Sequence, residues 1–256
     1  MLRFTIISGL LIILLVFSAS AANIKDGLLV YLPFEEGTGK VTKDVSGRGN
    51  NGQITDAEWA NGKFGKCLSF NGKSAFVEIP YKDDFNITDG ITLAAWIKID
   101  HLPLSPAYRG IINAKKSNYG PYLLQTSVVN GKNLYEFSFY IGAAWDWNVS
   151  TTEEVTDWVH LAGTFDTTTS LLYVNGKLDS TMKYAGKIAD NTKEGVVIGH
   201  FYGLADRWFH GLIDEVAIYN RPITADEVKT LFAGSLNAVE PNSKVATTWG
   251  MMKKTY

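Results

Sequence analysis

Short runs of β-branched and aromatic residues recur along the chain, separated by turn-forming residues. Such runs, bounded by turn signals, predict β-strands at Leu28–Phe34, Ala75–Pro80, Ile91–Ile99, Tyr135–Ile141, Val159–Phe165, Leu171–Val174, Val196–Gly199 and Leu212–Tyr219. Asn-Gly pairs, which tolerate the positive φ angles of tight hairpin turns, lie at 51–52, 61–62, 71–72, 130–131 and 175–176. Many short strands joined by turns favour an all-β protein, a two-sheet antiparallel sandwich or jelly roll.

The run Ile91–Ile99 shows the strand pattern most clearly. Its isoleucines, with Leu93 and Ala95, fall on one face at a period of two, which is the period of side chains along a β-strand. The opposite face carries Trp96. We therefore expect this strand to be buried on both sides, in the middle of the sandwich.

One short helix is predicted near the end of the strand-rich region. Thr224 is the expected N-cap of a capping box, with Glu227 as its third helical residue. A small apolar face follows, and Gly234 ends the helix. The remaining residues, 235–256, are polar and without periodicity, so we interpret them as a tail that follows a single domain over 22–234.

The first 21 residues have the pattern of a secretory signal. Arg3 precedes an uncharged apolar run at 10–17, and Ala19-Ser20-Ala21 supplies a small-x-small cleavage motif before Ala22. The alternative is a permanent membrane anchor, but the run is short against the roughly 20 residues of a spanning helix. We expect a secreted, cell-surface or periplasmic protein with no stable membrane span after cleavage.

The charge balance and the cysteine content argue against several other classes of protein. Lys and Arg total 24 against 26 Asp and Glu, so the net charge of −2 argues against nucleic acid as a partner. The single cysteine, Cys67, cannot form an internal disulfide or a cysteine-ligated metal site, and we expect it to be a small buried apolar residue.

Several blocks of the sequence, in order, carry a family resemblance. They are Gly27–Gly39, Asp44–Gly52, Phe64–Gly72, Phe76–Pro80, Ile91–Ile97, Trp158–Asp166, Leu172–Lys177, Val197–Gly199 and Phe209–Pro222. Together they resemble the laminin-G-like (LamG-like) jelly-roll domains of the concanavalin A-like lectin/glucanase class. This resemblance implies two antiparallel sheets of roughly six or seven strands each, and binding of glycans or extracellular proteins, without implying a defined reaction.

Two aspartates suggest a metal site. Asp214 lies in a predicted strand on the same face as Leu212, Val216 and Ile218, where a carboxylate is costly unless it is paired or metal-bound. Asp44 begins a glycine-rich loop whose carbonyl oxygens can converge, as calcium requires.

The family resemblance implies a structural calcium ion held by this loop and the late aspartate. Carried over, the ligands are Asp44, Asn50 and Asp214, with Glu35 or Glu36 as a further candidate. The alternative is that Asp44 starts an Asx-turn and that Asp214 caps a backbone amide or pairs with an arginine.

The sequence lacks the usual patterns of hydrolytic enzymes. Glucanases of this broad fold place alternate carboxylates of a Glu-x-Asp-x-x-Glu run in one cleft, because their mechanism needs two converging carboxyl groups. Here the pairs Glu153-Glu154 and Asp214-Glu215 are adjacent, so the members of each pair point to opposite faces of an extended strand. We expect no catalytic residues, and His160 is expected to be a partly buried strand residue.

Aromatic residues beside hydrogen-bonding groups are candidates for ligand binding, since sugar rings stack on apolar planes while their hydroxyl groups need polar partners. The candidates are Tyr140, Trp145, Trp147, Tyr108, Arg109 and Trp208. The alternative is that these aromatics pack the core or the loops. We therefore expect a non-catalytic module that binds carbohydrate or mediates adhesion, or else an extracellular protein-interaction domain without glycan specificity.

Overall fold

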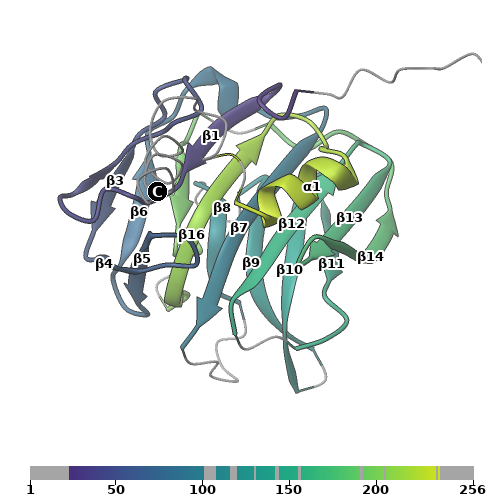
Figure 1. The fold of residues 1–256 in the computed structure, drawn as a ribbon. Helices are drawn as coiled ribbons and strands as arrows, with labels where there is room; N and C mark the ends of the chain where they lie inside the picture. The colour runs from purple at the N-terminus through teal and green to yellow at the C-terminus, as the bar shows by residue number, and fades with distance from the viewer. Residues whose placement is uncertain are drawn as a thin grey trace, which may run out of the picture.

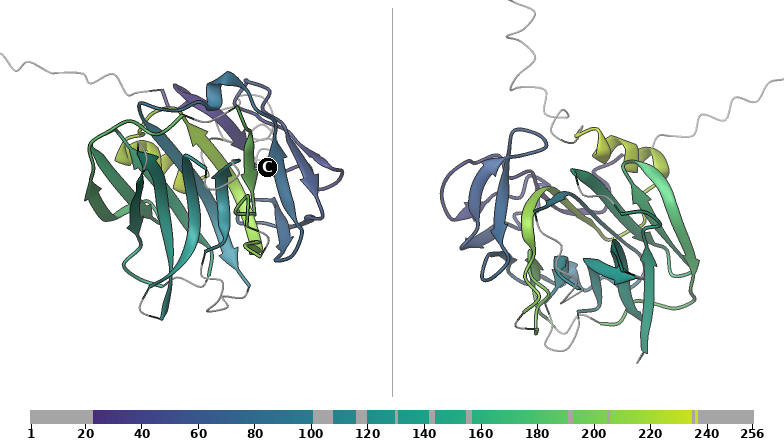
Figure 2. Two further views of the ribbon diagram at one scale, coloured as in Figure 1. Left: turned by 180° about the vertical axis from the view of Figure 1, so that it is seen from behind. Right: turned by 90° about the horizontal axis from the view of Figure 1, so that it is seen from below.

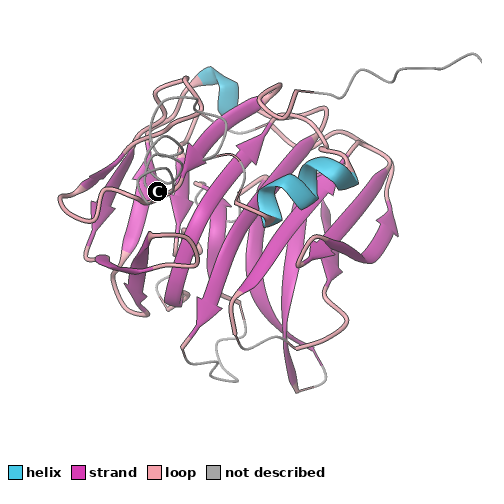
Figure 3. Ribbon diagram, in the orientation of Figure 1, coloured by secondary structure: helices cyan, strands magenta, loops and turns pink. Residues whose placement is uncertain are grey.

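The computed structural model describes residues 23–100, 108–115, 120–129, 131–141, 144–154, 157–190, 193–204, 206–234 and 236. They form two antiparallel sheets packed face to face with one short α-helix on the outside, which confirms the predicted jelly-roll sandwich (Figures 1 and 3). The predicted signal segment 1–21 and the tail from 237 onward lie outside the described residues. Within the described part, no helix is long and apolar enough to cross a membrane.

Sheet A contains the central strands of the fold. Its strands are β1 (Leu28–Leu32), β4 (Glu58–Asn61), β5 (Lys66–Asn71), β7 (Ile91–Ile99), β12 (Val159–Phe165), β13 (Thr169–Val174), β14 (Lys177–Lys183) and β16 (His210–Tyr219). They run in the order β14-β13-β12-β7-β16-β5-β4, and β1 also pairs with β16. The first and the last strands of the chain are therefore hydrogen-bonded neighbours.

Sheet B forms the second layer. Its strands are β2 (Val41–Thr42), β3 (Gly52–Thr55), β6 (Phe76–Ile79), β8 (Gly110–Ala114), β9 (Tyr122–Val129), β10 (Lys132–Ile141), β11 (Ala144–Ser150) and β15 (Val196–Ile198). Their order is β11-β10-β9-β8-β15-β6-β3-β2. Each sheet thus has eight strands, slightly more than expected, because short strands such as β2 and β4 carry little hydrophobic pattern of their own.

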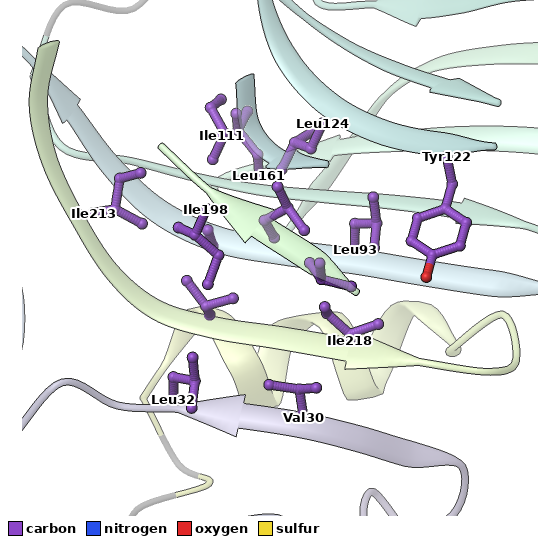
Figure 4. Packing of buried hydrophobic residues seen from close by; sticks show 14 of the residues in the cluster. Val30, Leu32, Leu93, Ile111, Tyr122, Leu124, Leu161, Ile198, Ile213 and Ile218 are labelled. Carbon is purple, nitrogen blue, oxygen red and sulfur yellow. The ribbon is translucent and has the colours of Figure 1, made fainter. Parts of the chain in front are cut away.

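The hydrophobic core lies between the two sheets, where both contribute every second side chain. Ile91, Leu93 and Ala95 of β7 belong to this core, as the period of two predicts. Figure 4 shows Val30, Leu93, Leu161, Ile198 and Ile218 among the side chains that meet there. The sheets approach so closely at Gly163 that a Cβ atom there would lie 2.2 Å from Cγ of Phe137.

The central strands of sheet A are covered on their outer face by helix α1 (Ala225–Phe232), which lies across the sheet (Figures 1 and 2). Trp96 of β7 is buried beneath it, with its ring stacked on Phe232 at a centroid distance of 5.3 Å. Val228 and Leu231 fill a second apolar cluster on this face, which also contains Leu236. Strand β7 is therefore buried on both sides, as expected, and ordered packing extends to Leu236.

Local sequence signals account for the helix and for one tight hairpin. The Thr224 hydroxyl accepts from the Glu227 backbone N–H, and the Glu227 side chain accepts from the Thr224 N–H, so the predicted capping box is present. Asn175 and Gly176 join β13 to β14 with φ angles of 50° and 77°, as a two-residue hairpin turn requires.

The prediction that Asp214 shares a face with Val216 and Ile218 is wrong. A β-bulge interrupts β16 between Asp214 and Ala217, and Glu215 within it has a φ of 54°. The bulge shifts the alternation of side chains by one residue. Ile213, Val216 and Ile218 all point into the core as a result, and Asp214 lies on the outer face of sheet A, opposite Trp96 of β7.

The capping box gives a first test of the fold. Replacing Thr224 with Ala removes the side-chain acceptor at the helix start, so we expect the free energy of unfolding to fall by about 1 kcal/mol. Thr230 provides the matched control, because its hydroxyl only donates back to the Asp226 carbonyl in mid-helix, and Thr230→Ala should be nearly neutral. Chemical denaturation measures both variants, and equal losses would contradict a specific role of the cap.

Candidate functional site

The loop 199–209, between β15 and β16, lies over the face of sheet B that points away from the core. This orientation follows from β6, where Val77 and Ile79 are core residues, so that Phe76 and Glu78 between them point outward. Phe76 lies beside Trp208 of the loop, with ring centroids 6.1 Å apart. The loop and the outward face of sheet B therefore form one continuous surface.

Aromatic side chains dominate this surface. The rings of His200 and Trp208 stack almost in parallel, with centroids 3.6 Å apart and an interplanar angle of 6°. Lys115 at the end of β8 places its Nζ atom 5.0 Å from the centre of the Tyr202 ring and forms a 2.7 Å ion pair with Glu78. His200, Tyr202 and Trp208 are all half-buried, which leaves part of each side chain at the surface. We refer to Phe76, Glu78, Tyr108, Arg109, Lys115, His200, Tyr202, Arg207 and Trp208 as the aromatic cluster.

Three of the predicted ligand-binding residues come together in this cluster. Arg109 Nη1 donates to the carbonyl oxygen of Trp208 at 2.6 Å, and the guanidinium group of Arg207 lies 5.3 Å from the centre of the Tyr108 ring. The segment before β8 and the loop 199–209 thus contact each other reciprocally. Trp208 is 99 residues from Arg109 in sequence, and only strand pairing brings it beside Tyr108 and Arg109.

Tyr140, Trp145 and Trp147 lie elsewhere on sheet B. Tyr140 of β10 pairs with Trp145 of β11, but the side chains of Trp145 and Trp147 lie outside the described residues. The Tyr140 N–H donates to the Pro121 carbonyl, whereas the Arg109 N–H donates to the Thr126 hydroxyl. The two groups of candidates are therefore separated by five residues along β9, roughly 17 Å.

Polar side chains fill the outward face of sheet B between these two groups. Asn113, Gln125 and Ser138, from β8, β9 and β10, are each at least nine-tenths buried. Among the described residues, neither amide atom of Asn113 has a hydrogen-bond partner, and the same is true of Gln125 Oε1 and Ser138 Oγ. Buried polar atoms are usually paired, so this row has hydrogen-bonding capacity that the described protein groups leave unused.

A single carboxylate, Glu136 of β10, anchors the row. Its oxygens accept from Ser127 Oγ at 2.6 Å, from Ser150 Oγ at 3.1 Å and from Gln125 Nε2 at 3.2 Å. These bonds satisfy a buried charge without a cation and fix the amide of Gln125 in place. Sequence patterns did not single out Glu136, although its position between Tyr135 and Phe137 in an alternating strand marks it as outward-facing.

The predicted calcium loop is held together by hydrogen bonds to Asp44. One carboxylate oxygen accepts from the backbone N–H groups of Tyr31 and Ser46, and the other accepts from Ser46 Oγ and from the Asn50 N–H, all at 2.7–2.9 Å. The Asn50 side chain donates to the Leu29 carbonyl at 2.7 Å. The Asx-turn that the sequence left open as an alternative is therefore present.

Asp214 lies in a different environment. Its Oδ2 accepts from the N–H groups of Lys63 and Phe64 at 2.8 and 3.1 Å, while the buried Oδ1 has no partner among the described residues. Burial raises the pKa of Asp214 to about 7, against the lowering effect of these hydrogen bonds. The carboxylate of Glu35 lies near the same loop, where its Oε1 accepts from the Lys66 N–H at 3.4 Å.

The structure does not bring the three predicted calcium ligands together. Leu29, which anchors Asn50, lies opposite the stretch 218–219 of β16, and Asp214 is four to five residues further along, roughly 15 Å away. Within the described residues, no group of three or more His, Cys, Asp or Glu side chains could hold a metal ion. Calcium binding by this chain therefore stays a prediction.

His160 and Cys67 have environments that suit structural residues. His160 is buried against the rings of Trp96 and Phe232, and burial lowers its pKa to about 3. Cys67 is buried and free, and burial raises the pKa of its thiol to about 12. Both groups are neutral at physiological pH, so neither is a charged acid, base or nucleophile there.

Comparison with known proteins gives one family match. The family described as the concanavalin A-like lectin/glucanases superfamily matches residues 71–229. No curated protein matches the chain.

Among solved structures, domain 4 of AbnA, an extracellular GH43 arabinanase from Geobacillus stearothermophilus, was determined in complex with arabinotriose. It is 21% identical with a TM-score of 0.63, over 80% of this chain and 97% of that one. The binding domain of Paraclostridial Mosquitocidal Protein 1 is 19% identical with a TM-score of 0.65, and the match covers 84% of this chain and 54% of that one. The binding domain of botulinum neurotoxin DC, determined in complex with rat synaptotagmin II, is 15% identical with a TM-score of 0.62. The match covers 83% of this chain and 52% of that one. This chain thus spans about half of the toxin domains, and the likeness shows the fold.

Asp44→Asn tests whether hydrogen bonding alone explains the first loop. The amide offers one acceptor oxygen in place of two and turns an NH₂ group toward N–H and O–H donors, so we expect a loss of about 1–3 kcal/mol in unfolding free energy. Asp56→Asn is the control, because Asp56 is exposed with a φ of 51°, which Asn tolerates. Thermal melts with and without a chelator should show the same loss, whereas a chelator effect in the wild type that disappears in Asp44→Asn would support calcium.

The raised pKa of Asp214 predicts a pH dependence of stability. In the unfolded chain the Asp214 carboxyl group has the ordinary aspartate pKa of about 3.8, and in the folded protein its pKa is about 7. Between these values the unfolded state loses the proton first, so this group makes the protein less stable as pH rises from about 4 to 7. Asp214→Asn should remove that decline, which denaturation at several pH values measures against Asp56→Asn. An unchanged pH profile would contradict the assignment.

Proposed function

We propose that this chain, which belongs to the concanavalin A-like lectin/glucanases superfamily, is an exported, non-catalytic module that binds carbohydrate. The observation that carries the proposal is the aromatic cluster beside the row of buried polar groups on sheet B. We place the sugar-binding surface at His200, Tyr202 and Trp208. Export follows from the predicted signal segment 1–21.

The chemistry of the surface suits a sugar chain. Sugar rings present apolar faces that pack on aromatic side chains, and the stacked pair of His200 and Trp208 with nearby Tyr202 offers such faces. Sugar hydroxyl groups need donors and acceptors at their edges, which Lys115 and Glu78 supply at the surface. Backbone hydrogen bonds join the two arms of the loop, from the Phe201 N–H to the Arg207 carbonyl and from the Phe209 N–H to the Gly199 carbonyl.

The placement of carboxylates supports binding without hydrolysis. The strands of sheet B carry two carboxylates with described side chains, Glu136 and Glu78. They lie on β10 and β6, four strand spacings apart, or roughly 19 Å. Glycosidases with two catalytic carboxyl groups need a separation of about 5–9.5 Å, so this pair does not form such a site.

A protein ligand is the second candidate, because one domain with this fold has been determined with a protein bound. Structures with this fold have been determined with different ligands, arabinotriose on the arabinanase domain and rat synaptotagmin II on the botulinum neurotoxin domain. The fold therefore does not choose between the two classes. The half-buried aromatic side chains beside unused polar groups favour sugar for this chain.

The proposal predicts that the aromatic cluster determines affinity. Tyr202→Ala and Trp208→Ala should each weaken binding to an oligosaccharide identified on a glycan array by about tenfold, as expected for the loss of an aromatic contact of about 1–1.5 kcal/mol. Leu178→Ala is the control, because Leu178 is 53% exposed on β14 of the other sheet. Isothermal calorimetry measures affinity, and melting curves show whether each variant is folded.

A silent array together with a co-purifying protein partner would overturn the carbohydrate proposal in favour of a protein ligand. Binding that survives both aromatic substitutions in folded protein would place the sugar elsewhere on the domain. Release of reducing sugar from a bound oligosaccharide would contradict the non-catalytic assignment.

A further inference from the structure

Two arginines in the aromatic cluster carry unused hydrogen-bonding capacity. Arg109 is only 9% exposed, and Arg207 is half-buried. The Nε atoms of both are buried, and among the described residues neither has a hydrogen-bond partner. Arg109 makes its hydrogen bond to the Trp208 carbonyl, and Arg207 rests on the rings of Tyr108 and Phe201, so neither contact supplies a negative charge.

The surrounding charges leave this pair of cations only partly compensated. Lys115 and Glu78 neutralise each other in a 2.7 Å ion pair. Asp206, which is exposed, acts on Arg109 through its charge, but no ion pair joins them among the described residues. Burial lowers the pKa of Arg109, as expected for a cation held in a poorly solvated place.

A buried or half-buried cation without a close anion is costly, and an anionic ligand would relieve that cost. The planar guanidinium group pairs with carboxylate groups through two parallel hydrogen bonds. Trp208, whose ring stacks on His200, connects these arginines to the aromatic rings: Arg109 donates to its carbonyl oxygen, and Arg207 precedes it in the chain. The positive charges and the stacking surface thus belong to the same loop.

We propose that the aromatic cluster binds an acidic sugar unit, with the sugar's carboxylate held by Arg207 and Arg109 and its ring packed on the adjacent aromatic side chains. This inference rests on the proposed carbohydrate-binding function and assigns its substrate class as carboxylated glycans. A sulfated sugar carries a related oxyanion, and the experiment below separates the two.

The test compares two probes that differ only at the sugar's carboxyl group. Oligogalacturonides and their methyl esters have the same sugar backbone, and esterification removes the negative charge. Calorimetry on the full mature chain should give at least tenfold tighter binding of the free acid, with a preference that weakens as salt is raised. Arg207→Gln should remove the preference, and Arg207→Lys, which keeps the charge but not the planar fork, should retain part of it.

Lys177→Gln is the matched control, because it makes the same change of charge at an exposed position on sheet A and should keep the full preference. Equal binding of acid and ester would overturn the acidic-sugar assignment and leave carbohydrate binding standing. Failure of neutral and acidic oligosaccharides alike would overturn the proposed function itself. Tighter binding of a sulfated oligosaccharide, or of a polyglutamate peptide, than of oligogalacturonide would also overturn the carboxylated-sugar assignment.

Discussion

The fold depends on how β16 changes partners halfway along one edge. One edge of β16 pairs with β7 over most of the length of β16. The other edge of β16 pairs with β5 at 210–213 and with β1 at 216–219. The β-bulge lies between these two stretches. There Asp214 accepts from the β4–β5 loop, and Glu215 accepts from the Tyr31 hydroxyl of β1. Two adjacent carboxylates of this late strand thus connect it to β1 and to the β4–β5 loop at the position where the ladder of strand hydrogen bonds is interrupted.

This junction also shapes the outer face of sheet A. Because the bulge keeps Val216 and Ile218 in the core, β16 can end at Tyr219 with its apolar outer residues beneath α1. The helix covers the central strands of that face, where Trp96 and His160 are buried, while β14 at the edge of the sheet keeps Leu178 exposed. The outward face of sheet B instead carries the row of buried polar side chains, whose hydrogen-bonding capacity the described protein groups leave unused.

The sequence was most informative where structure is local. The period of two in β7, the capping box at Thr224 and the Asn175-Gly176 turn depend on neighbouring residues, and the structure confirms each of them. The face of Asp214 could not be predicted in the same way, because a bulge adds one residue and reverses the alternation beyond it. Short strands such as β2 and β4 also escaped prediction, since their form depends on the strands beside them rather than on their own composition.

The candidate site could be predicted even less well from neighbouring residues alone. Tyr108, Arg109 and Trp208 were chosen as aromatic or polar residues in separate loops, and their meeting depends on β8 and β15 being neighbours in sheet B. Once β15 is placed beside β8, the chain leaving it at Gly199 must pass next to the residues that precede β8. The Gly199 N–H donates to the Ile111 carbonyl, and His200 then comes so close that a Cβ atom at Gly110 would lie 2.5 Å from its carbonyl oxygen. Glycine at 110 allows this approach, and the approach brings Arg109 to the Trp208 carbonyl and Arg207 to the Tyr108 ring. The chemistry of the site thus follows from strand order, which no single segment of the sequence encodes.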